Sequence, residues 1–555
     1  MNTAVLDEAV FTLKVHKDDW ARLGISRKQE HLRFMLERQV AIAERQVTVA
    51  AQAKRSPLTA EDWASGVYPI VRYLDLLHQS LAEVSRQGHP RISQRALRTR
   101  TDGQLVVTVV PTGGADKVLY RNFRGEVWMS RQVTRENLDD HLAGFYRQKD
   151  PQGKVALVLG AGNVASIAPL DVLHKLYVEG QVCLLKLNPV NDYLGPFLED
   201  IFSVLIAAGY VRIVQGGSDV GEYLCQHGDI DEIHLTGSNL THDAIIFGQG
   251  NEGLQRKQEN RPRLTKRMTS ELGNVSPVIV APGPWTKADL QFHAENIATQ
   301  MVHNGGCNCC AAQVLVLPSE WDLKKALLDE IRAVLSATPP RKAYYPGAQE
   351  RYERFVQGNP NAEVLSPRTP GSLPWTLIPD LSPDDSINLC YTTESFCGLM
   401  AQTSLTGDAE EFLQRAVAFC NDRLWGTLNA CIIIHPKTAR SLGARLEEFI
   451  AALRYGTVGI NHWPVLNFVW GATTWGAIPG HEPGNIQSGV GSVHNALLFD
   501  GPERSVIYGP FRVWPKPAWF ITNRKADEIF RRLVAMHARP GFAKVLGVAF
   551  AALGG

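Results

Sequence analysis

Four short apolar segments between residues 154 and 235 constrain the fold of this chain most strongly. They are residues 154–160, 182–187, 211–214 and 232–235, and segments long enough for helices separate them. Short apolar strands that alternate with helices are typical of a parallel sheet with helices on both faces. We therefore predict an α/β protein whose ligands bind at the carboxyl ends of these strands.

Glycine-rich or polar turns follow three of these strands. Gly160-Ala-Gly-Asn follows the first, Lys186-Leu-Asn-Pro the second and Thr236-Gly-Ser the fourth. The last would open a helix whose N-terminal amides can face a phosphate. Taken singly, each is equally consistent with plain turn chemistry, because the third glycine of a dinucleotide fingerprint is missing.

Three cysteines lie close together in His303-Asn-Gly-Gly-Cys-Asn-Cys-Cys310, which leads into the apolar segment 313–317. A thiol reacts as its thiolate, and glycines let backbone N–H groups approach the atom that it attacks. Their spacing does not fit paired zinc ligands, so no metal is expected. We predict that one of Cys307, Cys309 and Cys310 is a nucleophile, with inert buried thiols as the alternative.

Composition excludes several classes of partner. The 555 residues include 57 basic and 56 acidic side chains, and a formal net charge of +1 gives no argument for nucleic acid. The nine scattered cysteines fit a reducing compartment better than a disulfide framework. We see no secretory signal and no apolar run long enough to span a bilayer, and we expect a cytoplasmic protein.

In their order along the chain, these elements resemble the aldehyde dehydrogenase superfamily from about residue 150 to about residue 465. Further motifs that carry the resemblance are Val214-Gln-Gly-Gly-Ser, Glu271-Leu-Gly-Asn, Asn304-Gly-Gly-Cys-Asn-Cys, Glu394-Ser-Phe and Leu453-Arg-Tyr-Gly-Thr-Val-Gly-Ile-Asn. The resemblance implies an aldehyde dehydrogenase-like fold, with a Rossmann-type cofactor domain and an α/β catalytic domain. It implies N-terminal helices and the NAD(P) domain in residues 1–270, the catalytic domain in 271–463, and a segment serving oligomerisation in 464–555.

The resemblance assigns catalytic roles to Cys309, Glu271 and Asn163. The spacing from Asn304 makes Cys309 the nucleophile, while Cys307 stays a minor alternative because the distance to the following strand is one residue short. The side-chain amide of Asn163 and the backbone N–H of Cys309 would stabilise the oxyanion formed when the thiolate adds to an aldehyde. Glu271 would activate the water that hydrolyses the thioester. We expect this oxyanion hole to lower the pKa of the Cys309 thiol.

The resemblance also implies a cofactor, NAD or NADP, held by five residues: Lys186, Gly237, Ser238, Glu394 and Phe396. Lys186 resembles the residue at the adenosine ribose. Gly237 and Ser238 resemble the loop at the pyrophosphate, and Glu394 and Phe396 resemble the group that orients the nicotinamide ribose. Pro189 stands where many NAD-preferring relatives have a glutamate for the ribose 2′-hydroxyl. The choice between the two cofactors therefore stays open.

The leading function is NAD(P)-dependent oxidation of a hydrophobic aldehyde to its acid, through a Cys309 thiohemiacetal and thioester, by a homodimer or higher homo-oligomer. In the first alternative, the same cysteine forms the thioester but coenzyme A is the acyl acceptor in place of water, as in acyl-CoA reductases. Asn274 in place of a glycine favours that alternative, whereas the retained Glu271 favours water as the acyl acceptor. The second alternative is a catalytically silent scaffold, against which the intact catalytic set argues.

The flanking segments give further expectations. We expect a helix over 27–55, a second helix opened by a capping box at Thr59, and an extended segment over 117–123. Between Ser238 and Glu271 the chain is longer than is usual in the family, and the extra residues include the basic segment 255–267. It is predicted to be a solvated loop, with a docking site for a phosphorylated cofactor or coenzyme A as the alternative. The aromatic run 462–471 fits core packing and a substrate tunnel equally. The apolar tail 545–553 is expected to pack on the body or a subunit.

Overall fold

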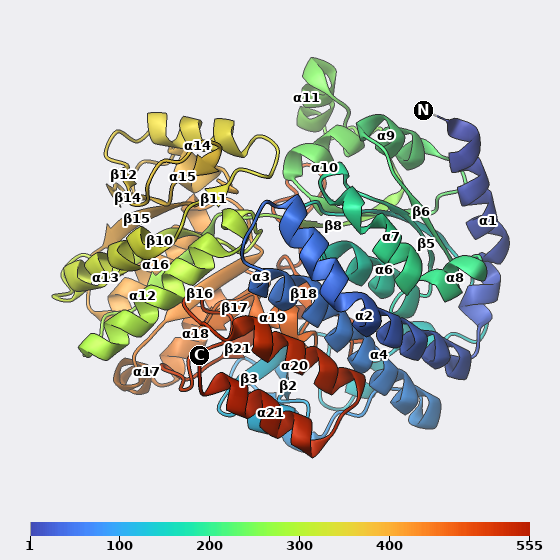
Figure 1. Cartoon of the computed structure of the whole chain (residues 1–555), viewed down its shortest axis with the longest axis horizontal. Coiled ribbons are helices and arrows are strands. Elements are labelled where there is room, and N and C mark those ends of the chain that lie inside the picture. The colour runs from blue at the N-terminus through green and yellow to red at the C-terminus, as the bar shows by residue number, and fades with distance from the viewer. Residues whose placement is uncertain (1) are drawn as a thin grey trace.

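Two sheets organise the chain in the computed structural model, which describes residues 2–555 (Figure 1). One has six strands in the order β19-β8-β7-β4-β5-β6, where β19 (Gly489–Val490) is an antiparallel edge strand. The other has eleven in the order β1-β2-β3-β21-β17-β16-β9-β10-β15-β14-β12. Helices alternate with parallel strands through both of them. The predicted α/β class is confirmed.

The six-stranded sheet contains the four apolar segments found in the sequence. Its parallel strands are β4 (Val155–Leu159), β5 (Val182–Lys186), β6 (Val211–Val214), β7 (Glu232–Gly237) and β8 (Arg267–Leu272). Every residue of β4 and β5 is buried, because helices cover both faces, and this explains their continuously apolar sequence. In β8, Glu271 lies beside Thr236 of β7.

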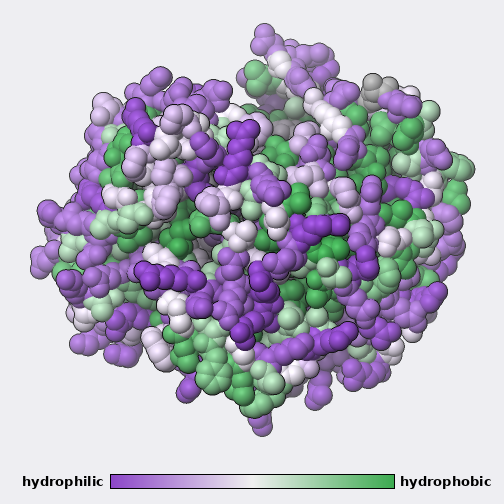
Figure 2. Space-filling view, in the orientation of Figure 1, coloured by the Kyte–Doolittle hydropathy of each residue, from purple (hydrophilic) through white to green (hydrophobic). Residues whose placement is uncertain are grey.

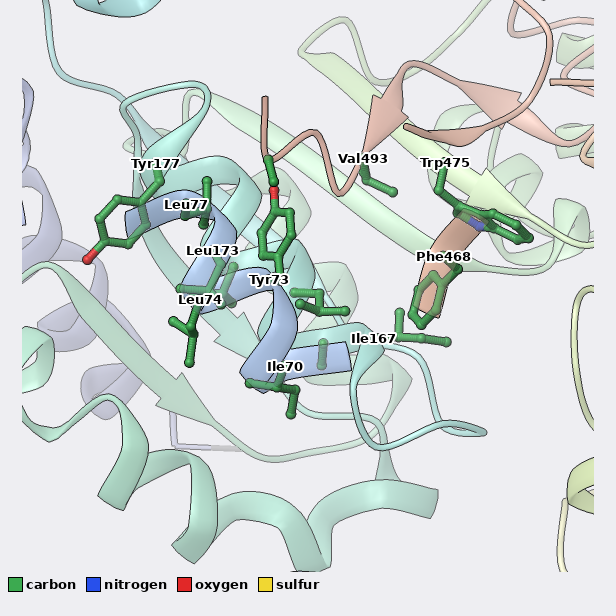
Figure 3. Packing of buried hydrophobic residues seen from close by; sticks show 14 of the residues in the cluster. Ile70, Tyr73, Leu74, Leu77, Ile167, Leu173, Tyr177, Phe468, Trp475 and Val493 are labelled. Carbon is green, nitrogen blue, oxygen red and sulfur yellow. The ribbon is translucent and has the colours of Figure 1, made fainter. Parts of the chain in front are cut away.

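Three long N-terminal helices lie around this sheet: α1 (Thr3–Arg22), α2 (Ile25–Ala53) and α4 (Tyr68–Gln87). Of these, α1 packs on β4, β5 and β6, while α2 and α4 pack on each other. Figure 3 shows Ile70, Tyr73 and Leu77 of α4 close to Leu173 and Tyr177 of α6 (Ile167–Tyr177). The predicted helix over 27–55 is confirmed as α2. The predicted capping box at Thr59 is wrong, because its hydroxyl donates instead to Asp527 at 2.8 Å.

The eleven-stranded sheet has a parallel centre. Its central strands are β9 (Ser276–Val280), β10 (Ala312–Pro318), β14 (Thr376–Leu381), β15 (Leu399–Leu405), β16 (Asn429–Ile433), β17 (Thr457–Ile460) and β21 (Pro502–Tyr508). Three antiparallel strands from the N-terminal part extend it: β1 (Leu97–Thr99), β2 (Leu105–Val110) and β3 (Arg124–Met129). The antiparallel β12 (Glu363–Val364) closes its other edge. The domain boundaries at residues 270 and 463 remain a prediction.

Two sequence-based expectations fail for local reasons. Residues 117–123 are not extended, since α5 (Asp116–Leu119) begins there. The buried carboxylate of Asp116 accepts hydrogen bonds from Arg72 of α4 and from Thr112, both at 2.5 Å, and these bonds hold the segment as a turn. The loop predicted over 255–267 is helical at its start, where α11 (Gly250–Gln258) follows α10 (Asn239–Ile246).

The C-terminal tail forms α20 (Ala526–Ala538) and α21 (Phe542–Ala552), which pack on each other, and α20 also packs on α4 and α2. Val545, Val548 and Ala551 of α21 are buried, so the tail packs on the body as expected. The other face of α21 is exposed and apolar, and Figure 2 shows this apolar surface at the lower edge of the molecule. In residues 2–555, no helix combines the length and the apolar character needed to cross a membrane.

Candidate active site

Two cavities meet at four side chains. The larger has a volume of about 910 Å³ and the smaller about 610 Å³. Both are lined by Asn163, Ile167, Glu271 and Cys309. All eight residues predicted for the site line the larger cavity, and the three predicted catalytic residues also line the smaller one. The fold thus brings together residues that are more than 200 positions apart in the sequence.

The cysteine loop is held by left-handed backbone and by one asparagine. Asn304 and Gly305 have φ values of 56° and 69°, a conformation that glycine and asparagine adopt most readily. A Cβ on Gly306 would lie 2.5 Å from the backbone of Cys397, so a side chain has no room there. The amide of Asn304 donates to the carbonyls of Asn163 at 2.9 Å and Cys307 at 3.1 Å. These bonds tie the turn after β4 to the cysteine loop.

Asn163 lies between β4 and α6, facing the point where the cavities meet. Its Nδ2 donates to the carbonyl of Cys307 at 3.0 Å. A side-chain amide carries two N–H groups. One therefore braces the cysteine loop, and the other remains for a ligand beside Cys309.

The three neighbouring cysteines occupy different environments. Cys309 lines both cavities, Cys310 lines only the smaller one, and Cys307 lines neither. The thiol of Cys307 donates to the carbonyl of Phe396 at 3.6 Å, and burial raises its pKa to about 12. The pKa of Cys309 is also raised well above its usual value, by its contact with the Cys310 thiol, then by burial and by the charge of Glu271. The lowered pKa expected for Cys309 is therefore wrong.

Glu271 is a buried carboxyl group with no hydrogen bond to its side-chain oxygens from any residue between 2 and 555. Burial, reinforced by the charge of Asp171, raises its pKa to about 8, while the Cys309 thiol and the Trp475 indole oppose that rise. Figure 3 shows Trp475 beside Phe468, and the centroids of the two rings are 5.7 Å apart. An unpaired carboxylate in such a place can accept a proton from a water molecule.

Glu394 lies on the other side of the larger cavity, between α15 (Leu389–Thr392) and β15. Burial and the charge of Glu271 raise its pKa to about 8, and Arg351 opposes the rise. A Cβ on Gly273 would lie 2.1 Å from a carboxylate oxygen of Glu394, so only glycine admits this side chain. The two carboxyl groups thus share one cavity, and the charge of Glu271 disfavours ionisation of Glu394.

A network of buried amides holds the backbone of Cys309. The carbonyl of Cys309 accepts hydrogen bonds from Asn429 at 3.1 Å and from Ser276 at 3.3 Å. Oδ1 of Asn274 accepts from the same two donors at 2.9 Å each, and Nδ2 of Asn274 donates to the carbonyl of Asn429 at 3.0 Å. In the sequence, Asn274 stood out only because it replaces a glycine of the family motif. Asn429 and Ser276 carried no sequence signal, because their partners come from distant segments.

The residues around the larger cavity fit a dinucleotide. Ser238 caps α10 by accepting a hydrogen bond from the N–H of Thr241 at 3.2 Å, and the start of this helix lines the cavity. A Cβ on Gly162 would lie 2.6 Å from Oδ1 of Asn188, so the turn after β4 stays open only with glycine. Oε1 of Glu394 is buried and, among residues 2–555, has no partner. A cofactor hydroxyl would satisfy it.

The smaller cavity is mainly apolar and aromatic. Side chains from α19 (Leu466–Trp470), from α21 and from the segments around them form its walls. The Phe, Tyr and Trp rings among them are Tyr68, Tyr120, Phe123, Trp463, Phe468, Trp470, Trp475, Trp514, Trp519, Phe530 and Phe550. In the aromatic run after Asn461, Trp463 and Trp470 are buried and also line this cavity, and a role of the run at the substrate stays a prediction.

Comparison with known proteins agrees with this geometry. Residues 146–349 match the sequence model of the aldehyde dehydrogenase family. Solved structures share the fold over most of their length. An aldehyde dehydrogenase of Mycobacterium tuberculosis complexed with NAD⁺ gives a TM-score of 0.61 at 17% identity, covering 91% of this chain and 89% of that one. An NADP-dependent glyceraldehyde-3-phosphate dehydrogenase of Bacillus halodurans complexed with NADP gives 0.59 at 17% identity, covering 91% of each.

Two curated relatives match shorter stretches. Aldehyde dehydrogenase [NAD(P)+] 1 of Saccharomyces cerevisiae is 35% identical over 250 residues, which are 41% of this chain and 45% of that protein. Human 4-trimethylaminobutyraldehyde dehydrogenase is 30% identical over 137 residues, 24% of this chain and 25% of that protein. The matched region thus spans less than half the length of these relatives. The sequence match and the fold together confirm the resemblance to the aldehyde dehydrogenase superfamily.

Proposed function

We propose that this protein is an NAD(P)-dependent aldehyde dehydrogenase that oxidises apolar aldehydes to carboxylic acids through Cys309. One observation carries the proposal: Asn163, Glu271 and Cys309 meet where an apolar cavity joins a cavity fit for a dinucleotide. An aldehyde entering from the apolar side reaches the thiol, while a cofactor in the larger cavity reaches the same point.

The first step joins Sγ of Cys309 to the aldehyde carbon. The thiol must lose its proton first, and the raised pKa values of Cys309 and Glu271 mean that neither group carries a charge readily before substrate enters. As the S–C bond forms, negative charge moves to the aldehyde oxygen. The second N–H of Asn163 and the backbone N–H of Cys309 would stabilise that charge. The amide network on the Cys309 carbonyl keeps the nucleophile in place.

The remaining steps leave the acid free. The nicotinamide cofactor, held by Lys186, Ser238 and Glu394, would accept the hydride from the carbon attached to Cys309. An acyl thioester then remains on the sulfur. Glu271 takes a proton from water, the hydroxide oxygen bonds to the acyl carbon, and the S–C bond breaks to return the thiol. Aldehyde, water and NAD(P)⁺ thus give acid, NAD(P)H and a proton.

The apolar cavity supports hydrophobic substrates. Its aromatic walls favour alkyl or aryl chains over charged ones, because a charge there would lose its hydration without a partner. The lysine and arginine side chains in its lining are Arg121, Arg512 and Lys516, and the last two flank the exposed Trp514 in the sequence. A chain could therefore enter there and extend to Cys309.

We further propose that the protein works in the cytoplasm as a homo-oligomer. Nine free cysteines support a reducing compartment. The open edge of β1 and the exposed apolar face of α21 offer surfaces that a second copy could cover. Light scattering coupled to gel filtration would measure the assembly.

Supply of the acyl acceptor tests the proposed reaction. Purified protein given octanal and NAD⁺ or NADP⁺, without any added thiol, should release octanoate and NAD(P)H in equal amounts. Turnover that starts only when coenzyme A is added, or ready reduction of octanoyl-CoA by NADPH, would establish the acyl-CoA reductase instead. Absence of both reactions would favour the silent scaffold.

A further inference from the structure

Two basic side chains, a carboxylate and a thiol from three parts of the chain line the larger cavity. Lys186 ends β5, Cys225 and Glu222 come from α9 (Ser218–Gln226), and Arg263 follows α11. All four residues line the cavity. Arg263 belongs to the basic segment that the resemblance marks as longer than usual. This segment is therefore part of the cavity wall and not only a solvated loop.

The backbone fixes Arg263 at the cavity. Its N–H donates to the carbonyl of Ile246, at the end of α10, at 2.8 Å. Its guanidinium donates to Glu222 at 2.7 Å, and its side chain is 31% exposed. The pair is thus open to the cavity, and the guanidinium keeps further N–H donors free for a ligand.

Positive charge dominates around the Cys225 thiol. Burial raises the pKa of this thiol to about 11, and the charges of Lys266, Arg263 and Lys186 oppose that rise, while only Glu222 adds to it. Lys266 is held by the carbonyl of His227 at 2.5 Å. Three cations thus act on one small region, and within residues 2–555 the Nζ of Lys186 donates to no protein acceptor.

An apolar wall stands beside these charges. Leu240 of α10 is 75% exposed although it is large and hydrophobic, and it lines the cavity together with Ala244 and Ile245. An exposed leucine next to cations suits the flat face of a purine whose sugar carries an anionic group. Figure 1 shows α11 standing out from the molecule beyond α10, the helix that carries this wall.

We infer that Arg263 and Lys186 form a subsite for the 2′-phosphate of NADP, so that this chain prefers NADP to NAD. The inference rests on the proposed function, because it assumes that the larger cavity holds the dinucleotide. A planar guanidinium can donate two parallel hydrogen bonds to a phosphate, and the lysine adds a point charge. Pro189 leaves no carboxylate at the position that would repel a 2′-phosphate.

Glu222 sets the strength of the subsite. Its carboxylate occupies one donor of Arg263 and carries the same sign of charge as the phosphate. The 2′-phosphate must therefore displace or share this partner. Removing the charge of Glu222 should strengthen phosphate binding, which is the opposite of the effect expected on removing Arg263.

Calorimetric titration with two probes tests the subsite without turnover. The probes are ADP-ribose and ADP-ribose 2′-phosphate. In the wild-type protein the 2′-phosphate should lower Kd by about tenfold or more, as a charged hydrogen-bonded pair does. Arg263→Gln should remove most of this gain while changing the Kd of ADP-ribose by less than about twofold. Glu222→Gln should enlarge the gain.

Arg261→Gln is the matched control, because Arg261 belongs to the same basic segment but pairs only with Glu259 and does not line the cavity. It should leave both Kd values unchanged. Equal Kd values for the two probes in the wild type, or equal weakening of both by Arg263→Gln, would overturn the subsite alone. Failure of both probes to bind the wild type would overturn the cofactor cavity, and with it the proposed function.

Discussion

At the scale of single residues, the thiol of Cys309 resists ionisation, because it is buried together with Glu271 and Glu394 and the charges of both carboxyl groups raise its pKa. Proximity to the Cys310 thiol is the largest cause of the raised pKa of Cys309. Sequence spacing identified Cys309 but could not show this effect, which depends on how side chains are placed in space.

Single substitutions should separate the three cysteines. Cys309→Ala should abolish aldehyde-dependent NAD(P)H formation, whereas Cys307→Ala and Cys310→Ala should leave substantial activity. Because its neighbour raises the pKa of Cys309, Cys310→Ala should also speed alkylation of Cys309 by iodoacetamide at pH 7.5 by about threefold or more. Peptide mass mapping after brief labelling measures this. Label that collects first on Cys307 would contradict the assignment of the nucleophile.

Ionisation of Glu271 should set the pH dependence of deacylation. A base must be unprotonated, and the pKa of Glu271 is about 8, so the group is mostly protonated at pH 7 and ionised at pH 9. Hydrolysis of a preformed acyl-enzyme should therefore rise by about tenfold per pH unit up to about pH 8 and level off above it. Mass spectrometry of the acyl-enzyme after transfer to buffers from pH 6 to 9.5 gives the rates. A rate that is constant between pH 6 and 8 would exclude Glu271 as the base.

The side chain of Asn274 should be needed mainly to hold the Cys309 nucleophile in position for acylation, and less for the stability of the fold. Asn274→Ala removes the acceptor shared by Asn429 and Ser276, and both can then turn away from the Cys309 carbonyl. We expect a stability loss of about 1–3 kcal/mol and an acylation rate lower by about tenfold.

Asn359→Ala serves as the control, because Asn359 is also buried and hydrogen-bonded but lies away from the cysteine loop, bonding the carbonyl of Phe355 at 2.8 Å. It should cost a similar stability without changing acylation. Chemical denaturation and stopped-flow acylation measure the two effects. Equal slowing by both variants would reduce Asn274 to a structural role.

At the scale of elements, continuous burial made the strands predictable and long-range ion pairs made other segments unpredictable. The four apolar segments became β4 to β7 because helices cover both faces of their sheet. Residues 117–123 were mispredicted because the buried pair of Arg72 and Asp116, which are 44 positions apart, imposes a turn. The start of the basic segment became helical in α11, where Arg256 pairs with Glu252 one turn earlier.

The last helix should act as one wall of the substrate cavity. Leu546, Phe550 and Phe542 of α21 are all exposed, but only Leu546 and Phe550 line the smaller cavity. The double substitution Leu546→Ala with Phe550→Ala should lower kcat/KM for dodecanal by about tenfold or more and for butanal by less than about twofold, since only a long chain reaches this wall.

Phe542→Ala is the control and should change neither substrate. Steady-state kinetics over aldehydes of increasing length gives the comparison. An equal loss for butanal and dodecanal would mean that α21 stabilises the fold without forming the substrate wall.

At the scale of the whole molecule, two cavities meet at the Cys309 thiol. One is mainly apolar, and the other is more polar and fits a dinucleotide. Sequence motifs predicted the residues at the larger cavity, because most of them end or directly follow strands of the six-stranded sheet. They could not predict the walls of the smaller cavity, which combine the N-terminal helix α4, the run after Asn461 and the tail. In the sequence, each of these segments has only the pattern of ordinary apolar packing, because the cavity forms only when the fold brings the segments together.

The most direct test of the account is single turnover by Glu271→Gln. This variant keeps Cys309 and both cavities but lacks the base, so octanal and cofactor should yield about one NAD(P)H per active site and then stall. Intact-mass analysis should show an octanoyl group on Cys309. Continued turnover at a rate near that of the wild type, or a burst without an acyl group on Cys309, would contradict the account.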